Sequence, residues 1–174
     1  MKYAYTNYDK EINIYLDSYP ETVFANEIKN LINYNNDMDG NLKIWTKNPV
    51  FEGINIEYYD SELKKGSSYP DFILKYKNHF VYIEVKSEND INSQKTDDIL
   101  KAYKKYIENY KTSTNINLTL LIAKIDKDKN ISFSGDSTLE SVRIILQNQS
   151  VKLKQIIKSI SENNLVSQEN NEQN

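Results

Sequence analysis

The chain of 174 residues has no cysteine, a single histidine and no apolar run that approaches the length of a membrane span. The lack of cysteine excludes disulfide bonds and thiolate metal sites. A membrane-spanning helix needs about 20 consecutive apolar residues, so no membrane-embedded segment is expected. The start of the chain, M-K-Y-A-Y-T-N-Y, lacks the apolar stretch of a secretory signal peptide. We therefore expect a cytoplasmic protein.

Basic residues are concentrated in the middle of the chain, although the net charge of the whole is -3. Residues 64–111 contain 10 Lys or Arg against 7 Asp or Glu, whereas residues 1–63 contain 5 against 11 and residues 112–174 contain 7 against 7. The net charge argues against a uniformly basic nucleic-acid-binding protein. The local basic region is compatible with a polyanionic substrate.

Hydrophobic periodicity predicts an α/β fold with a mixed central sheet and helices on both faces. Helices are expected over residues 19–34, about 93–111 and 138–161, the last of them broken near residues 149–150. Alternating patterns predict strands over residues 12–16, 42–47, 51–59, 72–76, 80–85, 116–125 and 131–134. Residues 60–68 are expected to form a polar loop and residues 163–174 a disordered tail. We predict one domain over residues 1–162, with its core at about 14–126.

Two pairs of residues fit the capping box that begins many helices. Ser18 with Glu21 would begin the first helix, and Ser137 with Glu140 the last. At 100° per residue, Glu21 also falls in the middle of the apolar face of its helix. On spacing alone, both a capping role and a functional role remain open for Glu21.

The segment Tyr69–Ser87, Y-P-D-F-I-L-K-Y-K-N-H-F-V-Y-I-E-V-K-S, predicts two apolar strands that contain three charged residues. Burying such charges is costly unless they are paired or bind a metal. Glu84 and Lys86 are two residues apart and point to one face, which Asp71 could reach from the neighbouring strand. This group can hold a divalent cation and activate a water molecule. A structural salt-bridge cluster is the alternative.

The other aromatic and imidazole side chains give weaker signals. His79 lies in the predicted turn between the two strands, so we expect it at the surface, neither a ligand nor a base. Tyr103, Tyr106 and Tyr110 follow helical spacing and fit a packing stripe. A nucleic-acid stacking platform is the alternative for these tyrosines.

The pattern Pro70-Asp71 followed by Glu84-Val85-Lys86 resembles the signature of the PD-(D/E)xK nuclease superfamily. More narrowly, L-D-S-x-x-E-x-x-F-A from residue 16, W-x-K-N-P from residue 45, Y-P-D-F from residue 69 and E-V-K-S from residue 84 resemble the C-terminal nuclease domain of type III restriction enzyme subunits and related helicase–nuclease proteins. The resemblance covers roughly residues 14–126. It implies a restriction-endonuclease-like fold.

The resemblance also implies a role for each matching residue. Asp71, Glu84 and the main-chain carbonyl of Val85 would bind Mg²⁺ through oxygen atoms, and Mn²⁺ could replace it. Lys86 would orient the attacking water or stabilise charge on the phosphate, a role that suits it better than that of general base. Glu21 would complete the site from the first helix, as a catalytic residue and a further metal ligand.

Polar residues of the second predicted helix are weaker candidates. Gln94 or Lys95 falls where such enzymes often place another active-site side chain. Lys95, Lys101, Lys104 and Lys105 could contact DNA phosphates. The alternative is that these lysines are only solvated, as most charged helix faces are.

These observations predict a Mg²⁺-dependent endonuclease that hydrolyses phosphodiester bonds in DNA, within a restriction–modification or anti-phage defence system. The sequence has no G-x-x-x-x-G-K-[ST] phosphate-binding loop, so a helicase or translocase would have to lie elsewhere. A helicase, a methyltransferase subunit or a second copy of the chain is an expected partner. The alternative function is that of a nucleic-acid-binding or assembly module that does not cleave. RNA is the alternative substrate.

Overall fold

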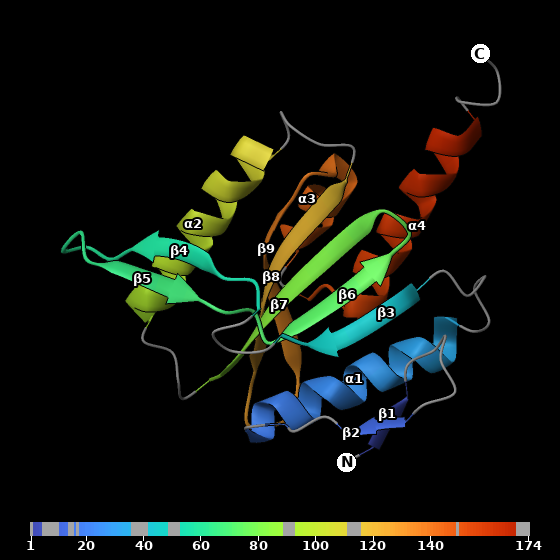
Figure 1. Ribbon diagram of the computed structural model, residues 1–174, viewed down its shortest axis with the longest axis horizontal. Helices are drawn as coiled ribbons and strands as arrows, with labels where there is room; N and C mark the ends of the chain where they lie inside the picture. The colour runs from blue at the N-terminus through green and yellow to red at the C-terminus, as the bar shows by residue number, and fades with distance from the viewer. Residues whose placement is uncertain are drawn as a thin grey trace.

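A five-stranded mixed sheet lies at the centre of the molecule (Figure 1). The computed structural model describes residues 2–4, 11–13, 16, 18–35, 42–48, 53–88, 93–110, 116–148 and 150–169. The strands of the sheet follow the order β3-β6-β7-β8-β9. Their bounds are β3 Leu42–Lys47, β6 Phe72–Tyr76, β7 His79–Ser87, β8 Asn117–Ile125 and β9 Ile131–Ser137.

The pair β7 and β8 is parallel, and every other neighbouring pair in this sheet is antiparallel. Helix α2, Ser93–Tyr110, connects β7 to β8 and returns the chain to the end at which β7 began. A crossover of this kind is what a parallel pair requires, whereas β6 and β7 need only a tight turn. The mixed sheet predicted from the sequence is therefore confirmed.

Helices cover both faces of the sheet, as predicted. One face packs against α1, α3 and α4, with bounds Tyr19–Asn35, Glu140–Leu146 and Leu153–Glu169. The other face packs against α2 through Ile99, Tyr103 and Ile107, which are buried against β8. Of the helices described, none is long and apolar enough to cross a membrane.

Two small sheets lie beside the central one. Strand β1, Lys2–Ala4, pairs with β2, Glu11–Asn13, so strand structure begins earlier than predicted, and Leu16 is not part of a strand. Strands β4, Ile56–Tyr59, and β5, Lys65–Ser68, form a hairpin. The expectation of a continuous loop over residues 60–68 was wrong. Strand β5 is polar, but its backbone pairs with β4, and Gly66 leaves room for the Tyr58 ring.

The prediction of a second capping box was wrong. Ser137 is the last residue of β9 and is fully buried, 2.8 Å from the Thr119 hydroxyl. Its own hydroxyl accepts a hydrogen bond from the Leu139 backbone amide at 3.1 Å. Helix α3 begins at Glu140 with no side-chain cap, because the serine belongs to the strand.

The last helical region is broken as expected, since α3 ends at Leu146 and α4 begins at Leu153. Helix α4 continues to Glu169, beyond residue 162, after which we expected a disordered tail. Extending an existing helix needs no new nucleation, so a polar sequence can continue it. Residues 170–174 lie outside the described part of the chain.

His79 is buried, which corrects the expectation that it lies at the surface. The turn between β6 and β7 contains only Lys77 and Asn78, and the strand pairing reaches back to Tyr76 and His79. Nε2 of His79 lies 2.7 Å from the Thr119 hydroxyl oxygen. Burial lowers the pKa of His79 from 6.5 to about 3, so this imidazole is neutral at physiological pH.

Candidate active site

Asp71, Glu84 and Lys86 lie together at one end of β6 and β7. Asp71 immediately precedes β6, and its Oδ2 accepts a hydrogen bond from the backbone amide of Val85 at 2.7 Å. Glu84 and Lys86 share a face of β7, where the Lys86 ammonium forms an ion pair with Glu84 Oε1. The strand pairing thus brings two carboxylates and a lysine from two neighbouring strands into one site.

Glu84 is only 6% exposed, and a chain of two hydroxyl groups leads to its second carboxylate oxygen. The Ser68 hydroxyl donates to Glu84 Oε2 at 3.2 Å, and the Tyr103 hydroxyl lies 3.2 Å from Ser68 Oγ. A serine hydroxyl has one proton, so Tyr103 must donate to Ser68 when Ser68 donates to Glu84. Burial, followed by the charge of Glu84, raises the pKa of Tyr103 and keeps that donor protonated.

Glu21 takes part in a capping box and also lies near the site. Its backbone amide donates to Ser18 Oγ at 3.3 Å, and the Ser18 hydroxyl lies 3.3 Å from Glu21 Oε1. Lys47, at the end of β3, forms an ion pair with Glu21 Oε2 at 2.8 Å. The charge of Glu21 is among the causes that raise the pKa of Asp71. Glu21 therefore contacts Ser18 as a capping residue does and also lies near the site, and its functional role stays a prediction.

The carboxylates of the site repel one another. Burial, followed by the charges of Glu84 and Glu21, raises the pKa of Asp71 from 3.8 to about 7, although the Val85 amide and Lys86 act in the opposite direction. A bound cation would relieve this repulsion between carboxylates. The donors are therefore chemically suited to a cation with a preference for oxygen.

The ligand set that the described residues offer is small. In this part of the chain, no group of three or more His, Cys, Asp or Glu side chains is arranged to hold a metal ion. Mg²⁺ is commonly bound through one or two carboxylates, with water and substrate phosphate as its other ligands. Asp71, Glu84 and the Val85 carbonyl fit that mode of binding. They do not form a closed site made only of protein ligands.

Several supporting residues were not identified from the sequence. Asn48 is buried, and its side-chain amide bonds both backbone groups of Ile54, at 2.7 and 2.9 Å. Its backbone amide donates to the carbonyl of Asp71 at 2.8 Å, which ties the end of β3 to the start of β6. The motif W-x-K-N-P contained the signal for Lys47 and Asn48. No local pattern pointed to Ser68 as a partner of Glu84.

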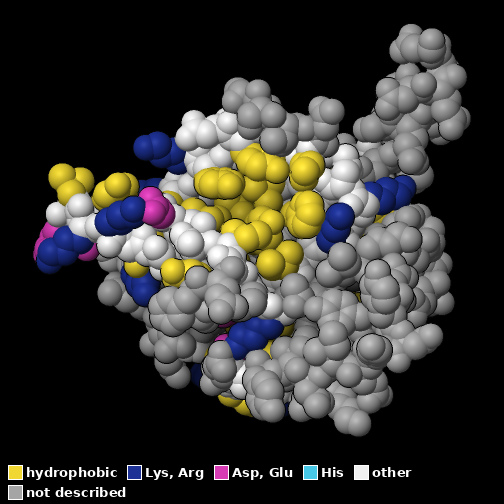
Figure 2. Space-filling view, viewed as in Figure 1, with side chains coloured by type: hydrophobic (Ala, Val, Ile, Leu, Met, Phe, Trp, Pro, Cys, Tyr) yellow, Lys and Arg dark blue, Asp and Glu magenta, His cyan; other side chains and the backbone are white. Residues whose placement is uncertain are grey.

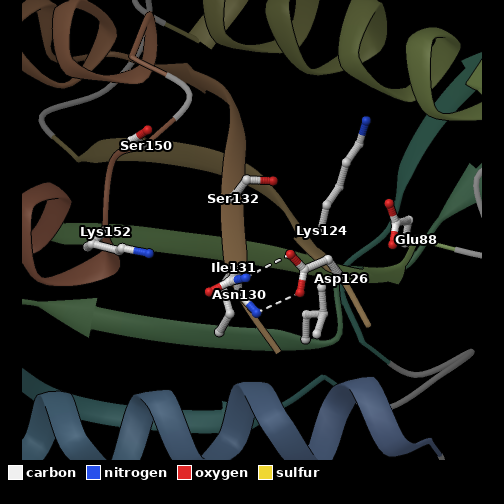
Figure 3. A pocket seen from close by; sticks show the side chains of 9 residues that line it. Glu88, Lys124, Asp126, Asn130, Ile131, Ser132, Ser150 and Lys152 are labelled. Carbon is white, nitrogen blue, oxygen red and sulfur yellow. Dashed lines mark hydrogen bonds between the residues drawn. The ribbon is translucent and has the colours of Figure 1, made fainter. Parts of the chain in front are cut away.

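A pocket of about 310 Å³ lies beside the site, at the ends of β8 and β9 (Figure 3). Lys124 in this pocket is the parallel-strand partner of Lys86, so both lysines lie on the same face of the sheet. Asn130 holds the carboxylate of Asp126 at 2.8 and 2.9 Å. The other residues that line the pocket are Glu88, Ile125, Ile131, Ser132, Ser150 and Lys152. Lys124, also unidentified from the sequence, places a second positive charge beside Lys86.

The four candidate lysines of α2 lie apart from the carboxylates. Lys95 and Lys104 are exposed, and exposed Lys101 pairs with Asp98 at 3.2 Å. Lys105 lines a groove between α2 and β4. None of the four forms a hydrogen bond or ion pair with Asp71 or Glu84 in the described structure. Gln94 also bonds Asp98, at 3.0 Å.

Comparisons with known protein families, with curated proteins and with solved structures found no match for this chain. Its function is therefore argued from the geometry of the site. The arrangement offers oxygen donors for a cation, with ammonium groups beside them for an anion. A site for a phosphate ester bound to a divalent cation needs both of these features.

Proposed function

We propose that the protein is a Mg²⁺-dependent endonuclease that hydrolyses phosphodiester bonds in DNA. The observation that carries the proposal is the convergence of Asp71, Glu84 and Lys86 at one end of β6 and β7, with Asp71 bonded to the Val85 amide. The mixed sheet, with α1 on one face and α2 on the other, supports a restriction-endonuclease-like fold. Because Mn²⁺ takes similar oxygen ligands, it should substitute for Mg²⁺.

In this proposal Asp71, Glu84 and the Val85 carbonyl hold the cation, which when bound would activate water and neutralise charge on the phosphate. Ser68 keeps the Glu84 carboxylate in a fixed orientation, and the Val85 amide does the same for Asp71. Lys86 stabilises the negative charge that develops on the phosphate. The lysine is positioned for this role by its ion pair with Glu84.

The position of Glu21 supports an auxiliary role. Its ion pair with Lys47 places another ammonium group near the start of β6, where Asn48 bonds the Asp71 carbonyl. We propose that Glu21 adjusts the charge of the site and becomes a further metal ligand if Lys47 turns to the phosphate. Lys95, Lys101, Lys104 and Lys105 remain weaker proposals for contacts with the DNA backbone.

The proposed biological setting is a restriction–modification or anti-phage defence system in the cytoplasm. A single site of this kind cleaves one strand, so cleavage of both strands requires a second site. A second copy of the chain would supply it. A helicase, translocase or methyltransferase subunit would select the DNA.

Nicking of supercoiled plasmid DNA tests this function. The wild-type protein should convert supercoiled to open-circular DNA with Mg²⁺ and not with EDTA, and Lys86→Ala should reduce the rate by at least about 100-fold. Lys158→Ala is a matched control, because Lys158 is an exposed lysine on α4. Equal nicking by the Lys86→Ala and wild-type proteins would refute the assignment of the site.

A second candidate is a nucleic-acid-binding or assembly module that does not cleave. It is favoured by one observation, namely that both oxygens of Glu84 already have protein partners. In that case the group is a structural ion-pair cluster. DNA would then be bound without being nicked, and Mg²⁺ would not change the stability of the protein.

A further inference from the structure

Four aromatic side chains form a partly exposed surface on the α2 side of the sheet. We call this surface the aromatic face and define it as Phe80 and Tyr82 of β7 with Tyr106 and Tyr110 of α2. Figure 2 shows hydrophobic side chains gathered over the middle of the molecule on the side that faces the viewer. Helix α2 packs on β9, β4 and β8, and the side chains of Phe80 and Tyr82 of β7 on this side are only partly buried.

The rings of the aromatic face are arranged in two stacked pairs. Phe80 and Tyr82 have ring centroids 6.2 Å apart and planes at 18°, and Tyr106 and Tyr110 have centroids 6.0 Å apart and planes at 23°. Burial, followed by the charges of Tyr110 and Tyr106, raises the pKa of Tyr82 to about 12. Tyr103 is 0% exposed, whereas Tyr106 is 44% exposed. Tyr106 therefore keeps much of its side chain in solvent, while Phe80, Tyr82 and Tyr110 are partly buried against the core under α2.

Lysines lie among these rings. The Lys75 ammonium is 5.2 Å from the Phe80 ring centroid, in cation–π geometry. Lys105 and Lys101 line the adjoining groove together with Tyr106, and the acidic side chains Glu57 and Asp98 line it as well. Apart from Glu84 in the candidate active site, the described residues of β6 and β7 place no acidic side chain on this side of the sheet. The aromatic face therefore combines flat rings with the ammonium group of Lys75, whereas the adjoining groove is lined by acidic and basic side chains alike.

This combination favours a nucleic acid over a protein partner. Surfaces that bind single strands combine basic side chains with aromatic rings on which unpaired bases stack. The centres of protein–protein interfaces are depleted in lysine. In a duplex the flat faces of the bases are already stacked on one another, so only unpaired nucleotides can use these rings.

We propose that the aromatic face binds unpaired nucleotides of a single-stranded or frayed nucleic acid and positions that strand beside the candidate active site. Phe80, Tyr82, Glu84 and Lys86 alternate along one side of β7, so Tyr82 is the next residue on this face before Glu84. The proposal rests on the proposed nuclease function for its purpose. It adds that the substrate carries unpaired bases.

Fluorescence anisotropy with 5′-labelled oligo(dT) in EDTA tests this binding without cleavage. The double variant Phe80→Leu/Tyr82→Leu keeps apolar side chains and removes two rings. Because the variant loses two rings on which bases stack, it should bind at least about 10-fold more weakly. The control is Tyr19→Leu, because Tyr19 is 63% exposed on α1, and it should bind like the wild type. Thermal denaturation checks that both variants are folded.

The outcomes separate this proposal from the nuclease function. Oligo(dT) binding that is equal in the folded double variant and the wild type overturns the aromatic-face proposal, even if plasmid nicking still depends on Lys86. Weaker binding by the double variant supports it, even if no preparation nicks DNA. If the wild type binds oligo(rU) more tightly than oligo(dT), and the double variant loses this binding, the aromatic-face proposal is supported with RNA as the bound strand. If the wild type is a dimer, the double variant is a monomer and both bind the oligonucleotide equally, the proposal is overturned in favour of self-association.

Discussion

Replacement of Asp71 by asparagine should stabilise the metal-free protein at neutral pH while removing the proposed function. Burial and the charges of Glu84 and Glu21 raise the pKa of Asp71 from 3.8 to about 7. The folded state therefore holds this proton more tightly than the unfolded state. The stability that it contributes is present in full below about pH 4 and is lost as the pH rises to about 7. An asparagine keeps the acceptor for the Val85 amide without the charge.

The size of the effect follows from the linkage between protonation and folding. Between pH 5 and pH 7 the wild type should lose about 2–3 kcal/mol of stability relative to Asp71→Asn. Urea denaturation in EDTA at pH 5, 6 and 7 measures this difference, because groups that do not interact with Asp71 titrate alike in the two proteins. Asp128→Asn, at an exposed turn aspartate, is the control and should show no such trend.

Addition of Mg²⁺ should then stabilise the wild type at pH 7 and leave Asp71→Asn almost unchanged, since a ligand that binds only the folded state raises its stability. A stability difference that stays constant from pH 5 to pH 7 would refute the proposed electrostatics. A variant that loses stability relative to the wild type as the pH rises would refute it as well.

Further predictions concern residues outside the candidate site. Burial lowers the pKa of His79 to about 3, so this imidazole contributes stability that is present above about pH 6.5 and lost as the pH falls towards 3. Compared with His79→Gln in urea denaturation, the wild type should lose about 2 kcal/mol between pH 6.5 and pH 5, and parallel profiles would contradict this. Gly135→Ala should reduce stability by more than about 2 kcal/mol, because a Cβ atom would lie 2.0 Å from the Leu120 carbonyl oxygen. Gly66→Ala should have a smaller effect in the same assay, because its Cβ would meet only the Tyr58 side chain, which can move; equal losses would contradict the reasoning.

The sequence predicted the parts of the fold that local patterns determine. Asp71 and Glu84 lie on or next to two strands that are adjacent in the sequence and joined by a tight turn. Their proximity could therefore be predicted without information about distant segments. The helical spacing of the first helix predicted its bounds to within one residue, Tyr19–Asn35 against residues 19–34. Periodicity of this kind is the strongest secondary-structure signal in a single sequence.

Other features depend on contacts between distant segments and could not be predicted. The Ser68 hydroxyl reaches Glu84 16 residues away, and Tyr103 reaches Ser68 across 35 residues. His79 sits in a polar sequence, but the register with Tyr76 makes it part of a buried strand. The spacing of Ser137 and Glu140 fits a helix cap, whereas the pairing of β9 with β8 makes Ser137 part of the sheet.

The aromatic side chains of α2 show the same limit within one helix. Helical spacing predicted a packing stripe of Tyr103, Tyr106 and Tyr110, and Tyr103 is indeed fully buried. Tyr106 follows the same spacing but is 44% exposed, and it lines the groove between α2 and β4. The position of a helix over a sheet is set by tertiary packing, which periodicity does not specify.

The most direct test of the central claim is an anomalous difference map from crystals soaked in Mn²⁺. The claim is that Asp71 and Glu84 hold a divalent cation beside Lys86. We predict a peak bound by both carboxylates and the Val85 carbonyl oxygen, and no peak at that position in Glu84→Gln crystals. A map without a peak there, or with its only peak in the pocket of Glu88 and Asp126, would contradict the claim.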